Sequence, residues 1–315
     1  TPADLQPAAG IVTRGEGNVV SHVQLLAWAL GIPNAVTASQ PFEAIAPHDG
    51  KKVFFIATPR GRVYLKEAAA MTAKDKAIYA EFNRNAERSG DGALGSGEHK
   101  LKVDPERLDL KTQLPIDLKA MRRKDSGVRS GPKAAFLGEL KHLFPDNVAR
   151  GIVIPFGAFH EHNRKAKVML PKGLKGHNIA SEGESLLEFE KATYHTFFDQ
   201  MIPAGKDEKT LSDWIRPRLE VIRYSLRNNP LAPELKDAMR DGLEANGLLR
   251  SDDKNRTVGC FVRSDTNVED QDNFNGAGLN LTIFNLDSLD DIYAGLKEVW
   301  ASPFTYRSFS WRQTV

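Results

Sequence analysis

The chain contains 315 residues, of which 41% are hydrophobic, so it is long enough for two domains of ordinary size, each with its own core. Its 43 Lys and Arg residues balance 41 Asp and Glu residues, and the two signs are interleaved, which argues against a nucleic-acid partner. No apolar stretch approaches the roughly 20 residues that span a bilayer, and no secretory leader opens the chain, so we expect a cytoplasmic protein without a membrane partner. From Thr1 and the abrupt end at Val315 we expect a piece of a longer polypeptide.

Residues 1–67 contain short alternating elements, which favour a compact α/β unit. A strand and a glycine-rich turn come first. A helix is then expected over 22–30, because Ser21 is a good N-cap and Gly31 a good helix stop. Two apolar segments within 51–67 are expected to pair as a β-hairpin.

Residues 68–127 are expected to form a flexible, partly helical linker, because a charged helical run is followed by a glycine and serine cluster that cannot pack a core. A larger unit is expected over 128–315. Its three leucine-rich helical patterns, within 182–248, predict a helical subdomain. Two strands and a helix with one apolar face follow. Cys260, in the first of these strands, is expected to fill the core rather than to act as a nucleophile.

His22 would be the first residue of the helix expected over 22–30. Backbone N–H groups and the positive end of the helix dipole converge at such a position, which favours the binding of an anion. An imidazole there stays neutral and can attack phosphorus, while the N–H groups hold the transferred phosphoryl group. The alternative from the residues alone is that His22 only caps a buried helix.

Two further segments carry residues suited to phosphate. RSGPKAAFLGEL places Lys133 in a turn at the start of a helix, where an ammonium beside free N–H groups suits a triphosphate. CFVRSDTNVED places Arg263 at the end of an apolar strand, where its guanidinium can pair with phosphate oxygens in a bidentate manner. Glu269 and Asp270 could orient that arginine or help to hold a magnesium ion. The alternatives are ordinary loop residues around Lys133 and a solvated acidic loop after Arg263.

The segment AGIVTRGEGNVVSHVQLLAWALGIPNAV closely resembles the phosphohistidine swivelling domain of the dikinases related to phosphoenolpyruvate synthase and pyruvate, phosphate dikinase. The lysine loop and the VRSDTNVED motif resemble the ATP-grasp domain of the same dikinases, and the latter looks most like plant-type glucan, water dikinases. VWASPFTYRSFSWRQ is similar to a segment of the synthase branch, in which Arg307 matches an arginine of that family. Asn18 and Trp28 stand where the family usually has glycine and arginine.

The resemblance implies an α/β fold with two domains, a small β/β/α phosphohistidine swivelling domain followed by part of an ATP-grasp domain with a helical subdomain. It implies that Lys133, Arg263 and Arg307 bind Mg-ATP and that the β-phosphoryl group ends on His22, with AMP and phosphate as the other products. The acceptor could be pyruvate, a glucan or another small molecule, the magnesium ligands are not fixed, and a homodimer is left open. A nucleotide-binding regulatory relic without phosphotransfer is the alternative, because of the substitutions at Asn18 and Trp28.

Overall fold

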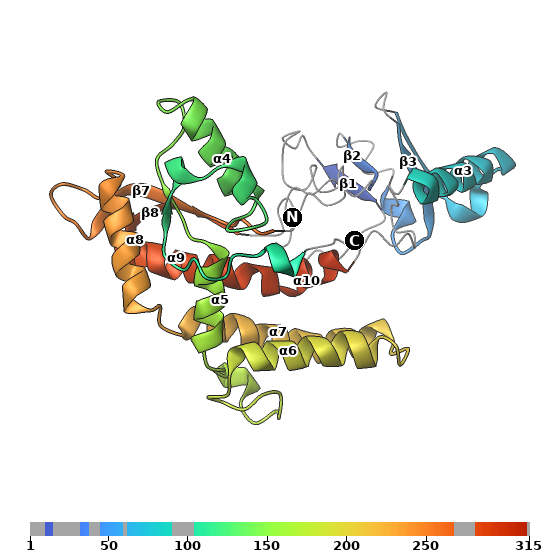
Figure 1. Ribbon diagram of the computed structural model, residues 1–315. Helices are drawn as coiled ribbons and strands as arrows, with labels where there is room; N and C mark the ends of the chain where they lie inside the picture. The colour runs from blue at the N-terminus through green and yellow to red at the C-terminus, as the bar shows by residue number, and fades with distance from the viewer. Residues whose placement is uncertain are drawn as a thin grey trace. The chain divides into compact units, whose positions relative to one another are not determined.

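The computed structural model describes residues 10–14, 32–37, 45–58, 62–89, 104–267 and 281–313. The chain folds as two compact units (Figure 1). One unit comprises residues 1–102 with 270–278 and 310–315, and the other comprises residues 103–269 with 279–309. None of the helices in these described segments is both long and apolar enough to cross a bilayer.

In the described part of the first unit, four strands form two pairs. The strands β1 (Ile11–Arg14) and β2 (Asn34–Thr37) are parallel, whereas β3 (Val53–Ala57) and β4 (Val63–Glu67) form an antiparallel hairpin. The strand and the hairpin expected from the sequence are therefore confirmed. The helix expected over 22–30 lies outside the described residues, and the assignment of a swivelling domain remains a prediction.

The helix α3 (Ala73–Ser89) packs beside the hairpin. The ring of Phe54, which is buried in β3, meets the ring of Tyr79 edge to face at 6.4 Å. Lys66 of β4 forms an ion pair of 2.8 Å with Asp75 in the first turn of α3. Short 3-10 helices occupy Ala46–His48 and Ala68–Ala70. The charged helical run is thus confirmed as a helix, and it belongs to the same compact unit as the hairpin.

The second unit begins at Val103, earlier than the start at residue 128 that the sequence predicts, and the division of the chain into functional domains stays a prediction. The strand β5 (Ile116–Asp117) pairs with β6 (Ile152–Val153), and Met121 is fully buried against the helix α4 (Pro132–Leu143). Periodicity did not reveal this part of the core because it consists of short strands and turns that bury single residues. Its 3-10 helices are Pro105–Arg107, Leu118–Ala120 and Arg123–Asp125.

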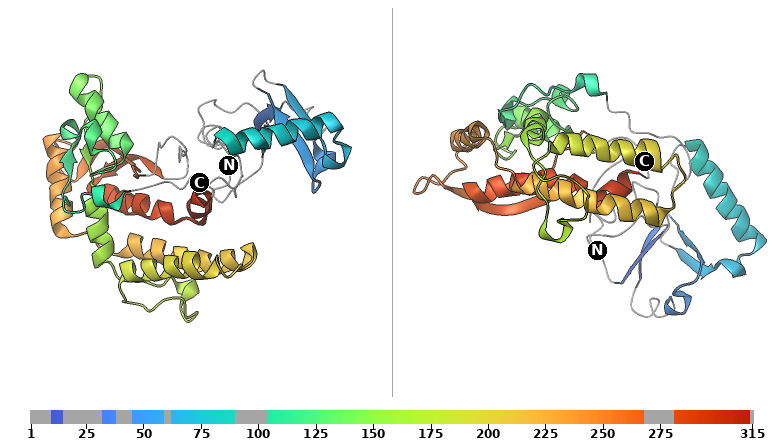
Figure 2. Two further views of the ribbon diagram at one scale, coloured as in Figure 1. Left: turned by 45° about the vertical axis from the view of Figure 1, so that its right-hand side comes forward. Right: turned by 90° about the horizontal axis from the view of Figure 1, so that it is seen from below.

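The helical patterns expected within 182–248 are confirmed as helices. The helices α6 and α7 run side by side (Figure 2) and share one core cluster with Val168 and Ala301. The helix α8 instead packs in a second cluster, with α9 and the strand β6. The bounds are α5 Phe156–Lys165, α6 Leu186–His195, a π-helical segment Thr196–Met201, α7 Glu208–Asn228 and α8 Pro233–Ala245, with a 3-10 turn at Lys172–Leu174.

An antiparallel pair of strands completes the second unit. The strands β7 (Arg256–Arg263) and β8 (Thr282–Ser288) are covered on one face by α9 (Leu289–Ala301), whose expected apolar face is confirmed (Figure 1). Cys260 is half-buried against this cluster, and burial raises the pKa of its thiol, which agrees with a packing role. The 3-10 turn Ser302–Phe304 and the helix α10 (Tyr306–Arg312) follow.

Candidate functional site

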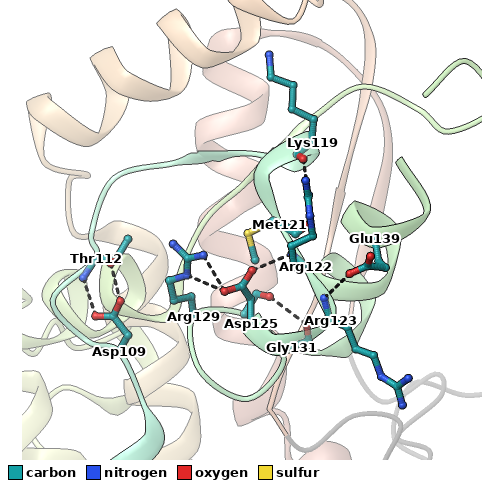
Figure 3. A network of polar contacts seen from close by, with 11 residues as sticks. Asp109, Thr112, Lys119, Met121, Arg122, Arg123, Asp125, Arg129, Gly131 and Glu139 are labelled. Carbon is teal, nitrogen blue, oxygen red and sulfur yellow. Dashed lines mark hydrogen bonds and ion pairs between the residues drawn. The ribbon is translucent and has the colours of Figure 1, made fainter. Parts of the chain in front are cut away.

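The loop that leads into α4 is held by a buried carboxylate (Figure 3). Asp125 accepts hydrogen bonds from the Nε and Nη2 atoms of Arg129, at 3.1 and 2.7 Å, and from the backbone N–H of Arg122 at 2.8 Å. The helix then starts at Pro132, with Gly131 as its N-cap. Proline suits the first helical position because its missing N–H is not needed there. The start of α4, and with it Lys133, therefore has a fixed position in the second unit.

The N-terminus of α4 is capped from a distant part of the chain. Asp265 accepts hydrogen bonds from the backbone N–H groups of Lys133, at 2.9 Å, and Ala134, at 3.0 Å, although it is 132 positions from Lys133 in the sequence. The sequence led us to expect free N–H groups beside Lys133, and for these two groups the expectation is wrong. A carboxylate already takes the place in which a bound phosphate could meet them.

The side chain of Lys133 also reaches the end of β7. Its Nζ atom lies 3.5 Å from the backbone oxygen of Ser264, the residue directly after Arg263. Ser264 itself is buried and donates its N–H to the backbone oxygen of Leu281 at 3.2 Å. The structure therefore brings together the lysine loop and the strand end that carries Arg263, as a common site requires.

Arg263 is exposed at the last position of β7, paired with Thr282 of β8. Phe261 lies two residues earlier and is 64% exposed, so it shares the face of the sheet opposite α9 with the arginine. Among the described residues, no side chain forms an ion pair or hydrogen bond with the Arg263 guanidinium. A guanidinium at such a strand end suits a bidentate contact with an anion.

Arg307, in the first turn of α10, is a half-buried cation. Its Nε atom is buried and has no hydrogen-bond partner among the residues that the structure describes, and desolvation lowers the pKa of its guanidinium. The preceding turn is tied to the strands because Ser302 Oγ accepts the N–H of Leu281 at 3.2 Å. A desolvated guanidinium with an unused donor gains most from an anionic ligand. No described hydrogen bond or ion pair joins Arg307 to Lys133 or Arg263.

Three of the expected site residues, His22, Glu269 and Asp270, lie outside the described residues. Within the described segments, no group of three His, Cys, Asp or Glu side chains is placed to hold a metal ion. The sequence analysis did not single out Asp265. Its only signal in the sequence is its position two residues after Arg263, in the same motif. Nothing in the linear order indicated that this carboxylate caps a helix encoded far upstream.

The second unit is thus a mixed α/β domain in which the start of α4 lies against the end of β7. The chain belongs to the family described as the pyruvate phosphate dikinase AMP/ATP-binding domain, whose model matches residues 129–315. The resemblance to the dikinases related to phosphoenolpyruvate synthase is thereby confirmed, and the family supports ATP as the ligand.

Two curated relatives are phosphoenolpyruvate synthases. The protein from Escherichia coli (strain K12) is 35% identical over 91 residues, which are 29% of this chain and 11% of the relative. The protein from Aeropyrum pernix is 25% identical over 185 residues, which are 59% of this chain and 19% of the relative. The matched regions thus span less than a fifth of these curated relatives, and no solved structure matches the chain.

Proposed function

We propose that this chain is the nucleotide-binding and phosphoryl-carrier part of an ATP-dependent dikinase-type phosphotransferase. The observation that carries the proposal is the contact between the lysine loop and the end of β7, which places Lys133 beside the strand that ends in Arg263. This contact lies within the region that matches the AMP/ATP-binding domain family.

In the proposed reaction, Lys133, Arg263 and Arg307 bind the phosphates of ATP. Phosphoryl transfer depends mainly on positioning and on neutralising the charge of the transferred group, which is why several cations around one nucleotide are needed. The buried Nε of Arg307, which has no partner among the described residues, and the exposed Arg263 both suit this role. Magnesium would neutralise charge on the phosphate oxygens, and Glu269 and Asp270 are the residues that we propose to hold it.

His22 is the proposed carrier of the phosphoryl group. A ring nitrogen of the imidazole attacks the β-phosphorus of ATP and AMP leaves, so that a pyrophosphoryl group is bound to the nitrogen. Water then attacks the terminal phosphorus, the γ-group leaves as inorganic phosphate, and the β-phosphoryl group stays on the nitrogen. A second acceptor, which could be pyruvate, a glucan or another small molecule, then takes the group. Phosphoenolpyruvate synthases among the relatives support a small-molecule acceptor.

Incubation of the chain with Mg-ATP labelled at the β-phosphate tests the carrier role. We expect acid-labile, base-stable label on the wild-type chain and none on His22→Ala. His48→Ala is the matched control, because His48 lies in the same unit. The competing proposal, a regulatory relic, rests on Asn18 and Trp28, which stand where the family usually has glycine and arginine. Tight Mg-ATP binding with no label on the wild-type chain would establish the relic instead.

A further inference from the structure

Asp265 makes the closest link between the two segments of the proposed nucleotide site. Both of its carboxylate oxygens are used: Oδ1 accepts the N–H of Lys133 and Oδ2 accepts the N–H of Ala134. A carboxylate that accepts two N–H groups at a helix N-terminus is favoured both by the hydrogen bonds and by the helix dipole. This cap therefore ties the first turn of α4 to the residues that follow β7.

The backbone around this cap leaves no room for a side chain. A Cβ atom on Gly131 would lie 2.3 Å from Oδ1 of Asp265 and 2.5 Å from the backbone oxygen of Thr266. Only glycine lets the two segments approach so closely. This close approach at Gly131 is an observation independent of the hydrogen bonds of the cap. It shows that the turn before α4 packs directly against Asp265 and Thr266.

The cap also determines how α4 can meet a phosphate. Two of the N–H groups at the helix start already bind a carboxylate, so a second anion at that point would be repelled. A phosphate can instead meet α4 at the side chain of Lys133, whose Nζ lies 3.5 Å from the backbone oxygen of Ser264. The location of this ammonium relative to Arg263 depends on the turn that Asp265 holds.

We propose that Asp265 is a positioning residue of the nucleotide site, which fixes Lys133 against the end of β7 by capping α4. The inference rests on the proposed function, because it assigns Asp265 a role in nucleotide binding that is exerted through Lys133. In this role Asp265 acts through Lys133 and not through a contact of its own with the nucleotide.

The test is a double-mutant cycle in the full 315-residue chain, with the affinity for Mg-ATP measured by calorimetry. Asp265→Ala is expected to weaken binding about tenfold in the wild-type background, because a pair of charge-assisted hydrogen bonds is lost. In the Lys133→Ala background the same change is expected to have an effect of less than about twofold, since the group that it positions is gone. Asp265→Asn keeps one acceptor and is expected to give an intermediate loss.

Asp207→Ala is the matched control. Asp207 caps α7 in the same unit through the N–H of Thr210, at 2.9 Å, so its loss destabilises a helix start by a similar mechanism. It is expected to leave the affinity for Mg-ATP unchanged. Hydrogen exchange of the Lys133 and Ala134 amides, measured without nucleotide, is expected to accelerate in Asp265→Ala and not in Asp207→Ala.

Two results would overturn this inference and leave the proposed function intact. One is an equal loss of affinity from Asp265→Ala with and without Lys133, which would mean that Asp265 acts directly on the ligand. The other is unchanged exchange of the two amides. A failure of the proposed function looks different, because the wild-type chain would then not bind Mg-ATP at all, and the role of Asp265 in nucleotide binding would fall with it.

Discussion

Glu190 provides a prediction for the pH dependence of stability. This side chain of α6 is 7% exposed, and its Oε2 atom accepts a hydrogen bond of 2.7 Å from the Nδ2 of Asn163 in α5. Its Oε1 atom and the Oδ1 atom of Asn163 are both buried acceptors without a donor among the described residues. Burial raises the pKa of Glu190 to about 7, and the hydrogen bond from Asn163 only partly opposes that effect.

The direction in which the free energy of unfolding changes with pH follows from the protons that Glu190 binds in the folded and unfolded states. Between pH 4.5, the ordinary pKa of a glutamate, and about pH 7, the folded state holds a proton on Glu190 that the unfolded state has released. The free energy of unfolding therefore falls as the pH rises through this window. A shift from 4.5 to about 7, at about 1.4 kcal/mol for each unit, corresponds to a loss of about 3 kcal/mol by pH 7.

Glu190→Gln isolates this contribution. An amide cannot ionise, and its N–H can replace the carboxyl O–H as a donor toward the orphaned oxygen of Asn163. We expect the variant to match the wild type near pH 4.5 and to be more stable by about 3 kcal/mol above pH 7. Denaturant unfolding of both proteins at several pH values measures the difference. Glu188→Gln, at an exposed position of the same helix that is paired with Lys191, is the control.

His162 has to be separated from this effect, because it lies beside Asn163 and is itself buried. Burial lowers the pKa of its imidazole, so its contribution to stability is lost as the pH falls through 6.5, which is the opposite direction. His162 is present in both the wild type and Glu190→Gln, so its contribution cancels in the difference between their free energies of unfolding. If this difference does not change between pH 4.5 and pH 7, Glu190 does not hold a proton in the folded chain and the reasoning is refuted.

Three further substitutions test the site and the core. Arg307→Ala is expected to weaken Mg-ATP binding about tenfold without lowering the free energy of unfolding, since it removes a desolvated cation whose Nε atom has no partner among the described residues. Arg240→Ala, at an exposed position of α8, should leave binding unchanged. A loss of stability in Arg307→Ala would contradict this account. Gly131→Ala is expected to destabilise the chain by about 1–3 kcal/mol in denaturant unfolding, whereas Gly151→Ala, where a Cβ atom meets nothing within 4 Å, should cost far less. Met121→Ala is expected to cost about 2–5 kcal/mol by the same measurement, and a negligible cost would mean that the residues before α4 are not part of the core.

The sequence by itself determined the local elements and the family. The hairpin within 51–67, the helix α4 and the apolar face of α9 follow from periodicity and from turn residues, which act over a few positions. The motifs around Lys133 and Arg263 carried the resemblance that the family match confirmed. These features were predictable because their signals are contiguous in the chain.

Only the tertiary structure decided how distant segments meet. The cap that Asp265 places on α4 joins residues 132 positions apart in the sequence. The hydrogen bond between Asn163 and Glu190 joins two helices through residues 27 positions apart. Met121 is buried in the core of the second unit, although the sequence places it in a linker. Periodicity contains no information about which partner a side chain meets across the fold, because burial, desolvation and long-range hydrogen bonds are set by packing between elements.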